Sequence, residues 1–157
     1  MSDSIQFGDY QVRQIDAADT IPIRNAVLRP QRPPEVCVYP GDHDDGAFHF
    51  GAFTREDDLI AIATVLPQAE ERFSKFADAV QHRLRGMAVL PEHRGAGVGR
   101  VLLEASLEKS KLAGCDVYWC NARKSATGFY LKSGFETLPE EFDVPDIGPH
   151  FVMFKKF

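Results

Sequence analysis

The chain has 157 residues, of which 44% are hydrophobic, and it carries a formal net charge of −5 with a pI near 5.5. This length accommodates one hydrophobic core of ordinary size, so the sequence predicts a single domain spanning residues 1–157. The acidic balance argues against a nucleic-acid-binding or membrane-surface protein, because such proteins usually carry a basic excess. Neither a cationic, apolar leader nor a run of roughly 18 apolar residues is present, so we expect a cytoplasmic protein without a membrane partner.

The first third of the chain predicts a strand, a helix and a long irregular loop. Residues 10–15 alternate between apolar and polar side chains as a half-buried strand does, and Asp16 occupies the N-cap position of a helix over residues 17–28. Four prolines and two glycines in residues 29–46 exclude regular structure there. Loops of this length in a compact domain are usually functional, so this loop is a candidate wall of a binding site.

Two groups of residues have to be considered as metal ligands. Residues 42–45 read Asp-His-Asp-Asp, but adjacent residues on a loop rarely converge on one ion, which favours a solvated acidic turn. The cysteines Cys37, Cys115 and Cys120 form no CxxC pair and indicate buried thiols rather than disulfides. The sequence therefore predicts no metal site.

The middle of the chain predicts an antiparallel hairpin and a weak helix. Residues 48–54 and 59–66 are β-prone and are separated by a polar connection of hairpin length. Within residues 70–80, Phe73 and Phe76 recur at a spacing that would place both rings on one face of a helix.

A strand, a glycine-rich loop and a helix follow in direct succession. Alternation along the strand predicts one face that carries Arg83, Arg85, Met87 and Val89. The helix begins near Val98 and ends at the glycine C-cap Gly114. Residues 115–120 form a strand immediately after it, so the segment predicts a βαβ unit with parallel strands.

The C-terminal part predicts a short helix and two strands. The helix covers residues 125–132, is capped by Ser125 and is stopped by Gly134. Residues 135–138 and 150–157 are β-prone and are joined by a polar, proline-containing segment, so we expect them to form an antiparallel end piece.

The glycine-rich loop before the central helix predicts an anion site. The first turn of a helix has N–H groups without intrahelical partners and carries the positive end of the helix dipole. Gly95, Gly97 and Gly99 let the backbone bring those N–H groups close to a phosphate. The loop is neither a P-loop, because no Gly-Lys-Ser/Thr follows, nor the GxGxxG of a dinucleotide fold. On residue types alone, a plain tight turn remains the alternative.

Two segments resemble the GNAT superfamily of acetyl-CoA-dependent N-acetyltransferases. The first is MAVLPEHRGAGVGRVLL, residues 87–103, in which Arg94, Gly97 and Gly99 fill the family pattern of Gln or Arg, two residues, Gly, one residue, Gly or Ala. The second is NARKSATGFYLKSGF, residues 121–135. Within the superfamily the chain resembles the ElaA-like branch, through the segments Val-Leu-Arg-Pro at 27–30, Asn-Ala-Arg at 121–123 and Gly-Pro-His at 148–150.

The resemblance implies an α+β fold with a mixed, mostly antiparallel central sheet. We expect about six to seven strands flanked by about four helices. The fourth and fifth strands of the family sheet, around Met87 and Asn121 here, are expected to splay apart and open a slot for the thioester. The chain is then expected to transfer an acetyl group from acetyl-CoA, as cosubstrate and without a metal, to a primary amine by direct attack in a ternary complex.

The resemblance also implies cofactor-binding residues. It pairs the strand backbone with the pantetheine arm and places the pyrophosphate on the glycine-rich loop. The residues assigned in this way are Met87, Ala88, Val89, Arg94, Gly95, Ala96, Gly97, Val98, Gly99, Arg100, Asn121 and Phe129.

Tyr130 is the candidate catalytic residue. It occupies the position at which many family members place a tyrosine that protonates the departing CoA thiolate. Aminolysis of a thioester benefits from such an acid, because the sulfur is a moderate leaving group. The alternative is that Tyr130 is a core aromatic beside Phe129.

The general base is not identified by the sequence. The glutamate that serves as base in the histone-acetylating branch aligns with Arg83, so that base is absent. The remaining candidates are Glu71, Glu92, His49, His82 and His150, and deprotonation through water is equally open. Arg83 and Arg85 are candidates to attract a carboxylate or phosphate of the acceptor, and pairing with an acidic residue of a neighbouring strand is the alternative.

The expected partner is a small-molecule or peptide amine, and nucleic acid is not expected. Dimers are common in the family, and the apolar run at residues 151–154 is a candidate surface for a homodimer. Two other functions stay open: transfer of a different acyl group, and a non-catalytic domain that binds acyl-CoA as a regulator or sensor.

Overall fold

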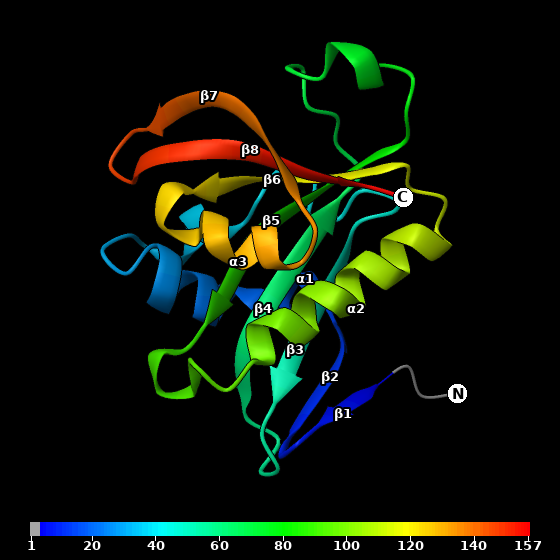
Figure 1. Ribbon diagram of the computed structural model, residues 1–157. Coiled ribbons are helices and arrows are strands. Elements are labelled where there is room, and N and C mark those ends of the chain that lie inside the picture. Colours follow the sequence, from blue (N-terminus) through cyan, green and yellow to red (C-terminus); the bar gives the residue numbers. More distant parts are fainter. Residues whose placement is uncertain (1–3) are drawn as a thin grey trace.

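The computed structural model describes residues 4–157, apart from the side chain of Ser74, and is organised around one twisted sheet (Figure 1). The strands are β1 (Ile5–Phe7), β2 (Tyr10–Ile15), β3 (Phe48–Phe53), β4 (Leu59–Leu66), β5 (Gln81–Val89), β6 (Val117–Arg123), β7 (Glu136–Val144) and β8 (Gly148–Lys156). The α-helices are α1 (Ala17–Ile23), α2 (Val98–Leu112) and α3 (Thr127–Lys132). No helix of the described residues is long and apolar enough to cross a membrane.

The sheet has the strand order β1-β2-β3-β4-β5-β6-β8-β7, and its described strands pair antiparallel except for the parallel pair β5 and β6. Helices α2 and α3 lie over one face and α1 lies over the other (Figure 1). The α+β fold, the mostly antiparallel sheet and the βαβ unit are therefore confirmed. Over residues 4–157 the sheet has eight strands and three α-helices flank it, so the expected six to seven strands and four helices were wrong in number.

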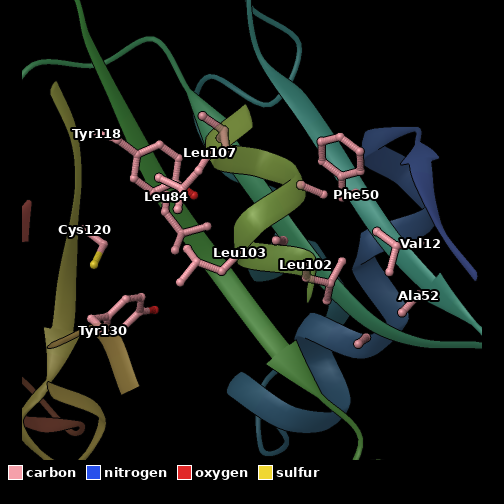
Figure 2. Close-up of a cluster of buried hydrophobic side chains, with 14 of the residues drawn as sticks. Val12, Phe50, Ala52, Leu84, Leu102, Leu103, Leu107, Tyr118, Cys120 and Tyr130 are labelled. Carbon is pink, nitrogen blue, oxygen red and sulfur yellow. The ribbon is translucent and has the colours of Figure 1, made fainter. Parts of the chain in front are cut away.

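The main core fills the space between α2 and the sheet. Leu102 and Leu103 of α2 are fully buried there, against side chains of the strands that include Leu84 of β5 (Figure 2). A smaller cluster on the opposite face joins Ile23 of α1 to Ile62 of β4. Burial of apolar side chains on both faces explains why β4 reads as a nearly continuous hydrophobic run.

Two predicted helices differ from the structure in the first half of the chain. The helix predicted over residues 17–28 is α-helical only to Ile23 and continues as a π-helix, η1 (Arg24–Leu28). The helix predicted over residues 70–80 is wrong: this segment holds one 3₁₀ turn, η3 (Ser74–Phe76). Phe73 packs instead on Trp119 and Phe154 of the sheet, so the tertiary contacts use the apolar spacing without a helix.

The predicted end piece is confirmed, with different bounds. Strands β7 and β8 pair antiparallel, but most of the segment read as a polar connection belongs to the strands themselves. The predicted helix over residues 125–132 begins as a 3₁₀ turn, η5 (Lys124–Ala126), and α3 starts two residues later than expected. Ser125 is therefore not its N-cap.

A β-bulge near Gly86 corrects the predicted faces of β5. The register between β4 and β5 shifts by one residue between Ile62 and Thr64, and Gly86 has a φ of +66°. An extra residue reverses the alternation, because every side chain beyond it turns to the other face. Met87 accordingly packs against the α2 cluster, whereas Arg83 stacks on the other face. The glycine inside the strand pattern was the available signal for this bulge.

The buried His82 is expected to make folding stability dependent on pH. Its Nδ1 lies 2.9 Å from the hydroxyl of Ser110 in α2, and burial lowers the pKa of His82 below its ordinary value of 6.5. The unfolded chain then binds a proton at a higher pH than the folded chain. The free energy of unfolding is expected to be fully developed above pH 6.5 and to fall as the pH drops through 6.5 toward the folded pKa. Urea denaturation of wild type and His82→Gln at pH 7.5 and 5 measures this loss.

The matched control is His43→Gln, because His43 lies exposed on a loop. His82→Gln should show a smaller loss of stability between the two pH values than wild type or the control. Equal losses in all three proteins would contradict the assignment of the pH dependence to His82.

Candidate active site

Strands β5 and β6 separate in the middle of the sheet and leave a slot. They pair only over Gln81–Leu84 and Val117–Cys120. Beyond these residues β5 has its bulge at Gly86 and stays paired with β4, while β6 stays paired with β8 through Arg123. A pocket of about 410 Å³ opens between the two strands, which is the splaying predicted for this point of the sheet.

The pocket is lined from both faces of the sheet. One wall is β5, a second is the end of β6 with α3, and the remainder comes from η1, the loop after it and the β7–β8 end piece. The lining residues are Val27, Leu28, Arg29, Tyr39, Arg83, Leu84, Arg85, Gly86, Met87, Ala88, Val89, Arg94, Cys120, Asn121, Ala122, Arg123, Ala126, Tyr130, Val144, Ile147 and His150.

Six of the predicted site residues line this pocket and the others do not. Those inside are Met87, Ala88, Val89, Arg94, Asn121 and Tyr130. The glycine-rich loop, residues 95–100, and Phe129 lie outside the lining. Phe129 nevertheless lies close to both the pocket and the glycine-rich loop. Its ring is edge-on to that of Tyr130, with 5.1 Å between the ring centroids. A Cβ atom placed on Gly99 would lie 3.9 Å from the same ring.

The glycine-rich loop has the geometry of an anion site at the start of α2. Gly95 and Gly97 both have a φ of +86°, a region that strongly favours glycine. The N–H groups of residues 95–100 donate to no protein acceptor in the described part of the chain. Arg94 fixes the entry to this loop, because its Nε donates to the carbonyl of Val89 at 3.0 Å. Unpaired N–H groups at a helix start attract a phosphate.

Asn121 presents an unsatisfied acceptor beside the pocket. Its Oδ1 is buried and has no hydrogen-bond partner among the described residues. Since buried polar atoms are nearly always paired, this oxygen fits a donor that a bound molecule brings into the slot.

Tyr130 lies at the junction of the pocket and the core. The side chain is 9% exposed, packs on Phe135 at 5.3 Å between centroids, and lies beside Cys120 (Figure 2). Burial raises the pKa of Tyr130 well above its ordinary value, and the neighbouring Cys120 raises it further. Burial likewise raises the pKa of the Cys120 thiol, to about 12. At neutral pH both groups keep their protons, so Tyr130 is able to act as a proton donor and not as a base.

His150 is the one base candidate that the structure brings to the pocket. Its Nδ1 lies 2.8 Å from the carbonyl of Gly148, which can only accept, so Nδ1 carries the proton and Nε2 of the neutral ring is an acceptor. The ring is 6% exposed and stacks at a tilt on Phe142 of β7. Within the described residues, the other four candidates, Glu71, Glu92, His49 and His82, do not line this pocket.

A buried polar network ties the loop after η1 to the sheet. Arg24 is fully buried and binds both carboxylate oxygens of Asp42, at 2.8 and 2.9 Å, and the hydroxyl of Thr64 at 2.7 Å. Nδ1 of His49 lies 2.8 Å from the hydroxyl of Thr64, and Nε2 of His49 lies 3.1 Å from the carbonyl oxygen of Asp42. Asp42 is therefore not part of a solvated turn, as residues 42–45 had suggested, although its three neighbours in that run are exposed.

The same network orders Tyr39, which sequence reasoning did not identify. The Tyr39 N–H donates to the Asp42 carboxylate at 2.9 Å, and the ring lies between the guanidinium groups of Arg24 and Arg85. Burial alone would raise the pKa of Asp42, but the hydrogen bonds from Arg24 and Tyr39 outweigh it and hold that pKa below its ordinary value. The ring also approaches the bulge, because a Cβ on Gly86 would lie 2.8 Å from it. The loop is thus part of the pocket wall.

The chain belongs to the GNAT family of N-acetyltransferases. The acetyltransferase (GNAT) domain family matches residues 46–137, more than half of the chain. A Bacillus subtilis protein described as the uncharacterized N-acetyltransferase YitI is 40% identical over 145 residues, which cover 92% of this chain and 95% of that protein. The chain is therefore an N-acetyltransferase, a class of enzyme that uses acetyl-CoA and acts on an amine.

Solved structures agree with the fold. Escherichia coli ElaA superposes with a TM-score of 0.74 at 19% identity, covering 94% of this chain and 99% of that one. FeeM, an N-acyl amino acid synthase from uncultured soil microbes, superposes with the same TM-score at 13% identity, covering 94% of this chain and 90% of that one. At these identities the likeness shows the fold alone, so membership of the ElaA-like branch stays a prediction.

Proposed function

We propose that the whole chain is one N-acetyltransferase domain that moves an acetyl group from acetyl-CoA to a primary amine by direct attack in a ternary complex. The observation that carries this proposal is the slot between β5 and β6, which reaches from the side of α3 to the side of η1. A slot open to both faces lets two substrates meet from opposite sides. Direct transfer between them then needs no acyl-enzyme intermediate.

The residues present fit a CoA-type molecule. The unpartnered N–H groups of residues 95–100 would hold the pyrophosphate, with Arg94 at the entry. Among the described residues, the part of β5 beyond the bulge, Met87 to Val89, is not paired with β6. Its backbone would therefore pair with an amide-bearing arm through groups other than the Val89 carbonyl, which already accepts from Arg94 Nε at 3.0 Å. The orphaned Oδ1 of Asn121 would accept one of the donors of that arm.

Two side chains on opposite faces of the sheet would handle the protons. Acetyl-CoA supplies a thioester, whose acetyl carbon is attacked by the amine and whose sulfur departs as a thiolate. Tyr130 lies on the α3 side and would give its hydroxyl proton to the sulfur. On the other face, Nε2 of His150 would take the proton of the amine. His150 lies on that face because side chains alternate along β8, and His150 shares its face with Val152 and Phe154.

Release of CoA thiol across a panel of primary amines tests the proposal. Wild-type protein should release CoA only when an amine is present, at a rate that depends on both substrates in a single sequential scheme. Binding of acetyl-CoA without release for any amine would contradict it and favour a sensor. Higher rates with longer acyl-CoA donors would show that the acyl group is not acetyl.

His150→Gln is expected to lower kcat/KM by roughly a hundredfold at pH 7, because a positioned base contributes at least this much. The deficit should narrow as the pH rises and free amine becomes abundant. Equilibrium binding of acetyl-CoA, followed by titration calorimetry, should stay unchanged. A deficit that is the same at all pH values would indicate that His150 only packs on Phe142.

A further inference from the structure

We propose that the acceptor carries an anionic group, a carboxylate or a phosphate, in addition to its amine, and that Arg83 and Arg85 bind that group. This inference rests on the proposed function, because it concerns the acceptor half of the same pocket. The observation behind it is the charge of the side chains that line the pocket. Within the described residues, five arginines and no Asp or Glu line the pocket, although the chain as a whole has a net charge of −5.

Both arginines of β5 are half-buried without a carboxylate partner among the described residues. Arg83 and Arg85 are only partly exposed, and neither has a carboxylate oxygen within 4.0 Å among the residues that the structure describes. The buried Nε of Arg83 also has no hydrogen-bond partner there. Burial lowers the pKa of both groups. Withdrawing a guanidinium from water without a counter-ion is costly, which indicates that the site is built for an anion that arrives from outside.

The charge of Glu70 acts on Arg83 and that of Asp42 acts on Arg85, but both acids form their ion pairs with other arginines. Glu70 accepts hydrogen bonds from the N–H and the guanidinium of Arg72, at 2.9 and 3.5 Å. Asp42 is held by Arg24. Among the described residues, neither Arg83 nor Arg85 therefore forms the direct ion pair with an acid of a neighbouring element that the alternative requires.

The two guanidinium groups are held by aromatic rings and one amide. Arg83 lies over Trp119, 5.1 Å from the ring centroid, and donates to the Gln68 amide oxygen at 3.3 Å. Arg85 lies over Tyr39, 4.1 Å from the ring centroid. Stacking fixes the planar groups while leaving in-plane N–H donors available, and two such forks match the oxygens of a carboxylate or phosphate.

The bulge separates these arginines from the cofactor half of the slot. Arg83 and Arg85 precede Gly86 and face the Trp119 and Tyr39 side of the sheet, whereas Met87 faces the α2 side. The expected acceptor is thus an amino acid or a phosphorylated amine, and a polycationic amine is disfavoured by repulsion.

Matched amine pairs test this inference. The assay compares CoA release for α-amino acids against their carboxamides, and for O-phosphoethanolamine against ethanolamine. The anionic member of at least one pair should have a kcat/KM roughly tenfold to a hundredfold higher, as a hydrogen-bonded charge pair provides. An α-amino amide is the less basic amine and holds more free base at pH 8, so nucleophilicity cannot produce this preference. The pair that responds distinguishes carboxylate from phosphate.

Variants of the two arginines locate the effect. In Arg83→Gln and Arg85→Gln the two members of the responsive pair should converge, while the KM for acetyl-CoA stays unchanged. Arg83→Lys should keep part of the preference, because it retains the charge and loses the fork. The control is Arg55→Gln, whose exposed side chain pairs with Asp9 away from the pocket, and it should behave as wild type.

Three results would overturn the inference. Equal kcat/KM for charged and neutral members would refute it while leaving the proposed function intact. A raised KM for acetyl-CoA in the arginine variants, with unchanged acceptor KM, would assign these residues to the cofactor. Absence of CoA release with every amine, despite bound acetyl-CoA, would refute the proposed function and this inference with it.

Discussion

Tyr130→Phe is expected to lower kcat by roughly a hundredfold to ten-thousandfold, the range for loss of a positioned general acid. The ring still fills its place between Phe129 and Phe135, so the KM for acetyl-CoA should change little. Since burial raises the pKa of the hydroxyl, the wild-type activity should show no decline from ionisation of Tyr130 as the pH approaches the ordinary tyrosine value. Steady-state kinetics of CoA release between pH 6 and 10 measures both effects.

The matched control is Tyr118→Phe. Tyr118 belongs to the same core cluster (Figure 2) and bonds Ser106 through its hydroxyl at 2.6 Å, but it does not line the pocket. Removing this hydroxyl should reduce stability by about 1–3 kcal/mol and leave kcat within a factor of two or three, the ordinary scatter of context. If Tyr130→Phe keeps full turnover, or if Tyr118→Phe loses as much, Tyr130 is a core aromatic and not the acid.

Arg24→Met is expected to lower the free energy of unfolding by about 3–5 kcal/mol, because it leaves the Asp42 carboxylate buried and unpaired. For a chain of this length that corresponds to a fall in Tm of roughly 6–20 °C. The pKa of Asp42 is depressed, so its contribution is present above the ordinary value of 3.8 and is lost as the pH falls through the folded value. Thermal and urea denaturation at pH 7 therefore measure the full effect.

Arg55→Met is the control for this prediction, because Arg55 and Asp9 form an exposed ion pair at 2.8 Å that should contribute no more than about 1 kcal/mol. The double variant Arg24→Met/Asp42→Leu should recover part of the loss, since the unpaired charge is removed together with its partner. A fall in stability no larger than that of Arg55→Met would show that water replaces Arg24 beside Asp42.

The elements that local patterns determine were predictable. Strand β2 was predicted with its bounds, the hairpin of β3 and β4 followed from its polar connection, and the glycine-rich junction placed the start of α2. These predictions rest on short-range effects: alternation, turn composition and helix capping act within a few residues.

What was missed depends on contacts between distant segments. The bulge at Gly86 reversed the faces of β5, which no period-2 argument can foresee. Asp42 and Arg24 are eighteen residues apart and pair only when the loop folds back on the sheet, so residues 42–45 read as a solvated turn. His150 could be selected among five candidates only after β8 placed it in the pocket. Short apolar β1 carried too few residues to give a pattern.

The limited pairing of β5 with β6 has a consequence for cooperativity. Strands β1 to β5 lie on one side of this short ladder, and β6, β8 and β7 lie on the other. The sheet therefore consists of two parts that are joined by the β5–β6 ladder and by the crossover helix α2. A molecule lodged in the slot would bridge both parts with hydrogen bonds. Occupancy should then slow hydrogen exchange on both flanks at once, and the empty protein should open first along this seam.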